Sequence, residues 1–377
     1  MTFGIKCPKC GLWQLPGPSC KTCGTWLDCA TPSPISPGGL GAAQILTPPL
    51  RIQPGFQMRV LEGEREGKLL SFHGAGGPLF SIYIMNIFLT IITLGFYYFW
   101  GKVRVQSYLM DQTDIEGDRF AFRGTGKELL IGFLKAMLVF AVPLTLLNVM
   151  PELMGAGVVI KKGVEFLAYG LIMVFIPVAM VGARRYRLSR TSWRGIRFSF
   201  RGQTWEFIKL FARGSFLTAI TLGVYYPIFD ARRYGFLVSH SYFGNRQFFF
   251  HGNGRDLLGR YLLALALTIP TVGLYWFWYL ATKQRFFWEN TSFGSACFRY
   301  TVTGRALMNL YLGNLLLLVG TLGLALPWVM VRKVQFVCKY LTLEGSLDVT
   351  SVRQEAQNAS ATAEALAGFL DAGFDLS

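Results

Sequence analysis

Residues 73–104 read HGAGGPLFSIYIMNIFLTIITLGFYYFWGKVR. An apolar stretch, about 78–100, contains the break Thr93-Leu94-Gly95 and ends in an aromatic run, after which Lys102 and Arg104 follow. A helix needs about 20 apolar residues to cross a hydrocarbon core, and Tyr, Trp and cations gather at the edges of that core. The stretch therefore predicts an apolar membrane helix, a break, an aromatic belt and a basic helix.

The same order of features returns along the chain and defines five units. Their starts are His73, Arg123, Arg201, His251 and Thr301. The intervals between starts are 50, 78, 50 and 50 residues, so the second unit holds an insertion. Alternating aromatic residues precede the later starts, as at Phe120 and Phe122, and this period of two predicts a short strand.

These features predict a mainly α fold, a polytopic membrane helical bundle of five repeats of about 50 residues each. We expect short β segments between repeats and a small N-terminal zinc ribbon. The expected parts are a head at 1–30, a Pro/Gly-rich linker at 31–68, a membrane domain at 69–350 and a polar C-terminal tail at 351–377. The expected repeats are about 73–122, 123–200, 201–250, 251–300 and 301–349.

Composition supports lipid as the solvent of this chain. Only 15% of the residues are charged, against about 25% in soluble domains, and 52% are hydrophobic. Six apolar stretches run at about 78–100, 129–149, 163–182, 207–229, 257–281 and 307–331. The net charge of +16 does not favour a nucleic-acid partner, because the cations follow successive apolar stretches. We expect the lipid bilayer and its anionic headgroups as partners.

Two membrane arrangements remain open. In the favoured one, each apolar stretch crosses the bilayer once, with two crossings in the second unit. In the alternative, the Thr-x-Gly break lets each helix dip into the bilayer and return, which requires packing around the broken backbone. Loop charges do not decide the sidedness of the N-terminus, because the Lys and Arg residues divide almost evenly between the two faces.

Residues 73–104, together with RGTGKELL at 123–130, resemble the YjgN-like bacterial inner-membrane family. The resemblance covers about Leu70 to Val349. It implies a multi-pass protein of the bacterial inner membrane. The family has no established activity, so the resemblance implies no functional residues. The cysteine-containing head departs from the family pattern and leaves an added role open.

The head contains two C-x-x-C-G motifs, whose cysteines are Cys7, Cys10, Cys20 and Cys23. Four thiolates at this spacing suit tetrahedral zinc, and a domain of about 30 residues is too small to hold a core without such a staple. We therefore predict a structural zinc ion. A redox dithiol or an iron site is the alternative.

Four polar side chains within the apolar stretches could line a polar path: Asn86, Lys135, Arg213 and Asn314. Lys209 and Arg260 also lie in such stretches, where charged groups are costly and often functional. The simpler interpretations are cations that reach the interface and asparagines that bond neighbouring helices. Contact with an anion is the functional alternative for the cations.

The function predicted from these features is coarse. We expect an integral inner-membrane protein of unknown activity that forms a path or groove for a solute or lipid. The alternative is a non-transporting scaffold or sensor whose zinc-binding head recruits a protein partner. We expect no enzyme, since the sequence contains no recognisable catalytic constellation. The substrate and the oligomeric state stay open.

Overall fold

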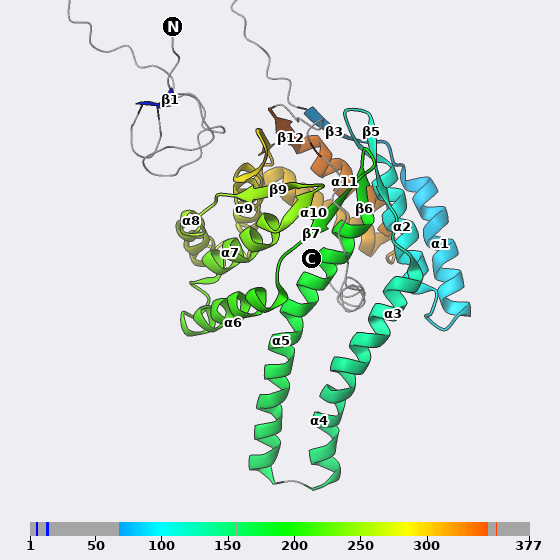
Figure 1. The fold of residues 1–377 in the computed structure, drawn as a ribbon, viewed down its shortest axis with the longest axis vertical. Coiled ribbons are helices and arrows are strands. Elements are labelled where there is room, and N and C mark those ends of the chain that lie inside the picture. The colour runs from blue at the N-terminus through cyan, green and yellow to red at the C-terminus, as the bar shows by residue number, and fades with distance from the viewer. Residues whose placement is uncertain (1–4, 7–12, 15–67, 156, 346–351, 353–377) are drawn as a thin grey trace, which may run out of the picture. The chain divides into compact units, whose positions relative to one another are not determined.

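A computed structural model describes residues 5–6, 13–14, 68–155, 157–345 and 352 (Figure 1). The chain divides into two parts, Met1–Glu66 and Gly67–Ser377. In the first part, β1 (Ile5–Lys6) pairs with β2 (Trp13–Gln14). The four cysteines of the expected zinc ribbon lie outside the described residues, as do residues 31–67 of the expected linker and nearly all of the tail.

The second part is built on a closed barrel of ten antiparallel strands. In chain order these are β3 (Lys68–Phe72), β4 (Thr113–Ile115), β5 (Asp118–Phe122), β6 (Thr191–Trp193), β7 (Ile196–Phe200), β8 (Ser241–Phe243), β9 (Arg246–Phe250), β10 (Thr291–Phe293), β11 (Ala296–Tyr300) and β12 (Leu341–Glu344). Each strand pairs with its neighbour in sequence, and β12 pairs with β3 to close the ring. We expected short β segments but not this closed sheet.

Helices fill every second interval between strands along the chain. They are α1 (Gly76–Ile92), α2 (Tyr98–Asp111), α3 (Gly126–Ala136), α4 (Val142–Leu153), α5 (Val158–Arg190), α6 (Thr204–Ile220), α7 (Tyr226–Ser239), α8 (Arg255–Ala266), α9 (Trp276–Glu289), α10 (Gly304–Gly320) and α11 (Leu326–Tyr340). A π-helical turn, η1 (Met137–Ala141), joins α3 to α4. The prediction of a mainly helical chain is confirmed.

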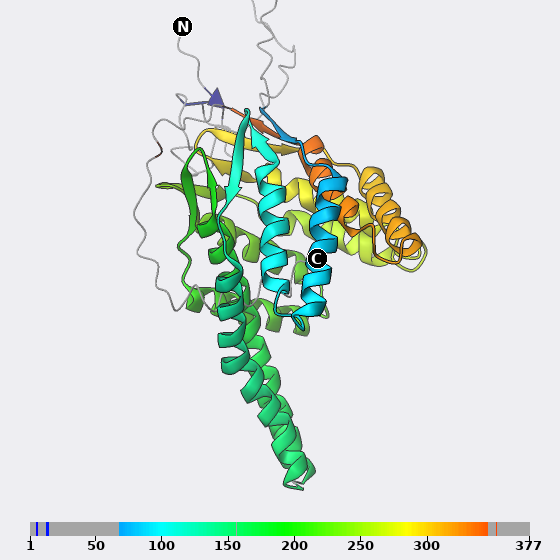
Figure 2. The same ribbon diagram turned by 90° about the vertical axis from the view of Figure 1, so that its right-hand side faces the viewer.

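The helices form five helical hairpins, each inserted between two paired strands. The long hairpin consists of α3, η1, α4 and α5, and the short hairpins are α1–α2, α6–α7, α8–α9 and α10–α11. Figures 1 and 2 show the hairpins projecting from the strands, with the long hairpin reaching farthest. Neighbouring hairpins also touch, through α2 with α3, α5 with α6, α7 with α8, α9 with α10, and α11 with α1. The helices therefore form a closed ring that follows the ring of strands.

Both ends of every hairpin lie at the same place, because the strands before and after it are hydrogen-bonded partners. Phe72 is opposite Thr113 across α1–α2, and Phe200 is opposite Ser241 across α6–α7. A single helix that crossed the bilayer would separate these ends by the thickness of the membrane. The paired ends do not fit one crossing per apolar stretch, and the short hairpins have the fold-back shape that the dip-and-return alternative requires.

Within the described residues, two helical stretches are long and apolar enough to cross a membrane, Gly126–Leu153 and Val158–Arg190. At 1.5 Å per residue they measure about 42 and 50 Å, more than the roughly 30 Å of a hydrocarbon core. The other four apolar stretches that we expected to span are interrupted by their Thr-x-Gly turns. The first helix of each short hairpin has 12 to 17 residues. The expectation of six spanning helices was wrong because it counted apolar length across these turns.

Aromatic side chains pack inside the barrel. Trp193, Phe243 and Phe293 are buried in one cluster with Val352, the described residue of the tail. The cluster also takes in Ile115, Phe120, Ile196, Phe198, Phe248 and Phe298, so that every strand from β4 to β11 contributes to it. Side chains from so many strands can meet only on the inner face of the ring. The barrel interior is thus a packed aromatic core.

Candidate membrane-contacting site

The four short hairpins turn on an exposed aliphatic residue. Leu94, Leu222, Val272 and Leu322 are each at least 90% exposed, and each has a φ of 49–50°. Residues other than glycine rarely adopt this left-handed conformation, and it is especially unfavourable for the β-branched Val272. Asn or Gly would suit an aqueous turn of this shape. The exposed aliphatic side chains at these turns are suited to contact with an apolar surface.

More aliphatic and aromatic side chains surround these four tip residues. Exposed large hydrophobic residues next to the tips are Ile91, Ile92, Phe96, Ile220, Val224, Ile269, Leu274, Val319 and Leu324. Scattered exposed apolar residues are ordinary on a soluble protein, but contiguous patches mark contact with a partner or a membrane. Each short hairpin therefore ends in an apolar patch.

The backbone of each turn bonds internally. In α6–α7, the six successive N–H groups from Thr221 to Tyr226 all donate to acceptors within the hairpin, at 2.8–3.1 Å. Five of these acceptors are backbone carbonyls, and the sixth is the Thr221 hydroxyl, which accepts from Tyr225 N–H. Hydrocarbon requires backbone groups to be satisfied within the protein.

The hydroxyl recurs in the same role in the other short hairpins. Thr93 accepts from Tyr97 N–H, Thr271 accepts from Tyr275 N–H, and Thr321 accepts from Ala325 N–H, at 2.9, 3.3 and 3.1 Å. Each of these hydroxyls also donates to the carbonyl four residues earlier. The Thr-x-Gly mark seen in the sequence is thus a turn whose backbone donors need no water.

A groove of about 350 Å³ lies along the hairpin α6–α7. Its lining includes three cations, Lys209, Arg213 and Arg232, and one carboxylate, Glu206. The remaining lining residues are Leu210, Gly214, Leu217, Tyr225 and Phe229. One end of the groove is therefore basic, and Leu217 lies toward the apolar tip.

Contacts within the hairpin orient two of these cations. Arg232 Nη1 donates to the Tyr225 hydroxyl at 2.6 Å, and the guanidinium carbon lies 5.8 Å from the centre of that ring. Lys209 Nζ lies 5.3 Å from the Trp205 ring. Among the described residues, no carboxylate lies within ion-pair distance of Lys209, Arg213 or Arg232. The three groove cations thus lack an ion-pair partner within the described part of the chain.

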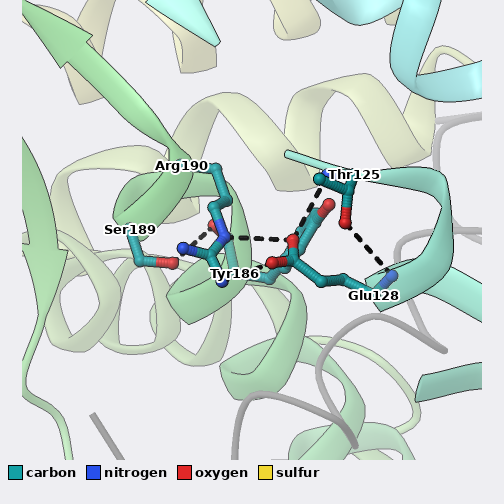
Figure 3. Close-up of polar contacts among 5 residues, drawn as sticks. All are labelled: Thr125, Glu128, Tyr186, Ser189 and Arg190. Atoms are coloured by element: carbon teal, nitrogen blue, oxygen red, sulfur yellow. Dashed lines mark hydrogen bonds and ion pairs between the residues drawn. The ribbon is translucent and has the colours of Figure 1, made fainter. Parts of the chain in front are cut away.

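A polar cluster closes the base of the long hairpin (Figure 3). Thr125 and Glu128 form a capping box at the start of α3, in which each side chain accepts from the other residue's N–H. Arg190, the last residue of α5, donates to both Glu128 oxygens, at 2.7 and 3.1 Å. The negative charge near the start of α3 therefore has a partner at the end of α5, beyond the favourable interaction with the helix dipole.

The chain matches the family model described as a bacterial protein of unknown function (DUF898), over residues 68–274, 247–309 and 271–369. The chain belongs to this family. It is 32% identical over 131 residues to the inner membrane protein YjgN of Salmonella typhimurium, and 35% identical over 130 residues to YjgN of Escherichia coli O157:H7. These matches cover 35% and 34% of this chain, and 31% and 30% of the relatives. The chain thus spans about a third of the length of the curated relatives it matches. No solved structure matches it.

In this DUF898 chain, the residues of the expected polar path lie on four helices. Asn86 on α1 is buried and donates to the Gly101 carbonyl of α2 at 3.1 Å. Asn314 on α10 is also buried. Lys135 on α3 is exposed, and Arg213 on α6 lines the groove. Within the described part of the chain, no hydrogen bond or ion pair joins any two of them.

Sequence analysis singled out Lys209 and Arg213 but did not group them with Arg232 and Tyr225. The reason is the crossing model, which placed the residues after the Thr-x-Gly break on the opposite face of the membrane. The sequence spacing of the three cations does indicate that they could lie near one another. Lys209 and Arg213 are four residues apart and so share a helix face, and Arg232 lies ten residues after Leu222 where Arg213 lies nine residues before it.

Proposed function

We propose that this chain is a bacterial inner-membrane protein that seats a ring of helical hairpins in one leaflet and holds a lipid in a groove of that ring. The long hairpin crosses the bilayer and the four short hairpins enter only the leaflet beside the barrel. The observation that carries this proposal is the set of four tips, each an exposed aliphatic residue in a left-handed turn with internally bonded donors.

Helix lengths support a one-leaflet depth for the short hairpins. The first helices α1, α6 and α10 have 17 residues each, or about 26 Å, and they start at the barrel. That length passes a headgroup layer and reaches the middle of a core about 30 Å thick. The names of the YjgN relatives support the same membrane.

A groove is favoured over a path along the barrel axis. The aromatic cluster of β4 to β11 occupies the barrel interior, so a solute on the axis would have to displace buried rings. The groove of α6–α7, by contrast, is lined by residues of its own hairpin and contains Arg213 of the expected polar path. A polar path through Asn86, Lys135, Arg213 and Asn314 stays a prediction.

Two parts of the proposal rest on the sequence. The regular spacing of the unit starts supports five structural repeats, each contributing one hairpin. The spacing of Cys7, Cys10, Cys20 and Cys23 supports a structural zinc ion, and the head could recruit a protein partner. Metal analysis of the purified chain, before and after replacement of Cys20 and Cys23 by serine, tests the zinc.

Fluorescence in vesicles tests the depth of the tips. A fluorescent amino acid sensitive to its environment replaces Leu222 or Leu322 in protein reconstituted into neutral phosphatidylcholine vesicles. We expect blue-shifted emission that lipids spin-labelled near the chain end quench and iodide does not. The control position is Arg194, in the turn between β6 and β7. Tips that iodide quenches as strongly as the control position would overturn the proposed embedding.

A further inference from the structure

We propose that the groove between α6 and α7 binds the phosphate of an anionic phospholipid headgroup through Lys209, Arg213 and Arg232. The inference rests on the proposed function, because it takes the tip of this hairpin to lie in hydrocarbon. Phosphate oxygens accept hydrogen bonds from guanidinium and ammonium groups, and arginine offers them a planar pair of donors.

The charge balance of the groove favours an anion. Three cations and the single carboxylate of Glu206 line it, a formal net charge of +2. Arg233, next to Arg232 in α7, has its charge balanced within the protein. It and Lys283 of α9 both pair with the buried Asp230. The three groove cations have no such partner among the described residues. A ligand with negative charge would supply one.

The depth of the cations matches the phosphate layer of one leaflet. Arg213 lies nine residues before Leu222 and Arg232 lies ten residues after it, so both are about 14 Å from the tip along their helices. Half of a hydrocarbon core is about 15 Å. With Leu222 near the middle of the bilayer, both guanidinium groups reach the layer where headgroup phosphates lie.

The groove also has a place for acyl chains. Leu217 belongs to its lining, and the exposed Phe216, Ile220 and Leu222 continue from there to the tip. A lipid with its phosphate at Arg213 would therefore place its chains along apolar side chains. Free inorganic phosphate would satisfy the cations but would leave this apolar surface unused.

The other hairpins lack this set of cations. The positions of Lys209, Arg213 and Arg232 correspond to Ser81, Met85 and Arg104 in α1–α2, at the same distances from the unit start. Arg104 shares only the ring contact of Arg232, with its guanidinium carbon 5.6 Å from the centre of the Tyr97 ring. The hairpin α1–α2 is therefore a natural control, with one cation in place of three.

Close helix packing at Gly214 and a hydrogen bond to Arg232 set the geometry of the groove. Gly214 faces Phe229, and a β-carbon on Gly214 would overlap the Phe229 ring. The two helices therefore approach closely beneath the cations. Tyr225 bonds one N–H of Arg232, which leaves the other donors of that guanidinium for a ligand.

Binding of short-chain lipids to the full chain in a neutral detergent tests the inference. The probes are dioctanoyl phosphatidylglycerol, dioctanoyl phosphatidylcholine and inorganic phosphate, followed by native mass spectrometry and by tryptophan fluorescence. We expect phosphatidylglycerol to bind at least about tenfold more tightly than phosphatidylcholine, a difference of about 1.4 kcal/mol. Inorganic phosphate should bind far more weakly than phosphatidylglycerol.

Variants locate the site. Arg213→Gln with Arg232→Gln should remove the preference for phosphatidylglycerol, Arg213→Lys should keep most of it, and Arg104→Gln should leave it unchanged. The three substituted side chains lie on helix surfaces, and melting temperatures will show that each variant folds. Equal binding of both lipids, equal loss in Arg104→Gln, or phosphate binding as tight as phosphatidylglycerol binding would overturn the inference. Lipid binding in detergent does not depend on insertion of the tips into a bilayer. Loss of the lipid preference is therefore distinct from failure of the proposed tip embedding, which the vesicle fluorescence measures.

Discussion

The indole ring of Trp328 lies directly against Gly76, so that α11 of the last hairpin packs on the start of α1 in the first. A β-carbon on Gly76 would overlap the ring, and the Phe80 ring lies 4.9 Å from it, centre to centre. The same pairing joins other neighbours, with Trp100 on Gly126 and Trp278 on Gly304. The contact that links consecutive hairpins thus also closes the ring.

Replacement of Gly76 by alanine should weaken this closing contact. A methyl group there would push the Trp328 ring out of place, and overpacking of this kind costs about 1–3 kcal/mol of unfolding free energy. Gly77→Ala is the matched control, because open space surrounds its added methyl group in the same helix turn. Denaturant unfolding in detergent measures both. Equal stability of the two variants would show that the contact does not hold the ring closed.

Stability should fall as the pH is lowered, through His251. Burial lowers the pKa of His251, whose Nε2 lies 3.2 Å from the Ser292 hydroxyl. In the unfolded chain a histidine titrates near pH 6.5, so below that pH the unfolded state takes up the proton first. Stability is therefore complete above about pH 6.5 and declines as the pH falls toward the pKa of the folded state.

Melting temperatures at pH 7.5 and 5.5 measure this decline. His251→Gln should reduce the difference between the two temperatures, and the control His73→Gln should leave it in place. His73 is the residue that corresponds to His251 at the start of the first unit, but its ring lies beside Asp114 at 2.9 Å. If both variants keep the full difference, another group causes the decline.

The sequence predicted the local turns better than the pairing of strands. Thr221-Leu222-Gly223 and its equivalents are visible as breaks because a glycine follows an apolar run. β4 escaped detection because a strand of three residues, Thr113–Ile115, has too few positions to show alternation. The turn after β4 favours a β-hairpin with β5. Glu116 and Gly117 form this two-residue turn, and both have a positive φ.

Closure of the barrel could not be predicted from local patterns. β12 and β3 lie at opposite ends of the membrane domain, and their pairing depends on the hairpins between them. The alternating aromatic residues indicate which side chains of a strand share one face. Phe120 and Phe198 lie on the inner face, and their rings are 6.4 Å apart. They did not give the number of strands or the closure. The groove was missed for the same reason, because it needs two helices that fold back on each other.

The polar cluster at the base of the long hairpin should stabilise it measurably. Arg190→Met removes two charge-assisted hydrogen bonds to Glu128, which in partly exposed groups are worth about 1 kcal/mol. Ser189→Ala is the control, because its hydroxyl donates only to the Tyr186 carbonyl of the same helix. Unfolding in detergent is measured for Arg190→Met, for Glu128→Gln and for the double variant. The three values give the coupling energy between the two side chains. Additive effects would show that the two side chains do not cooperate.

The turn of α6–α7 offers the sharpest test of a membrane-embedded tip. Thr221→Val keeps the size of the side chain but removes the acceptor of the Tyr225 N–H. Thr218→Val is the matched control, since the Thr218 hydroxyl donates to the Gly214 carbonyl and accepts from no backbone donor in the turn. Thr221→Ser restores the acceptor.

In water the exposed N–H of Tyr225 would bond to solvent, and the loss of Thr221 would cost little. In hydrocarbon an unsatisfied backbone donor costs several kcal/mol. We therefore expect Thr221→Val to lower the melting temperature of the protein in vesicles well below that of Thr218→Val, and Thr221→Ser to restore it. Equal melting temperatures for the two valine variants would mean that water reaches this turn, and the hairpin tips would then lie outside the hydrocarbon core.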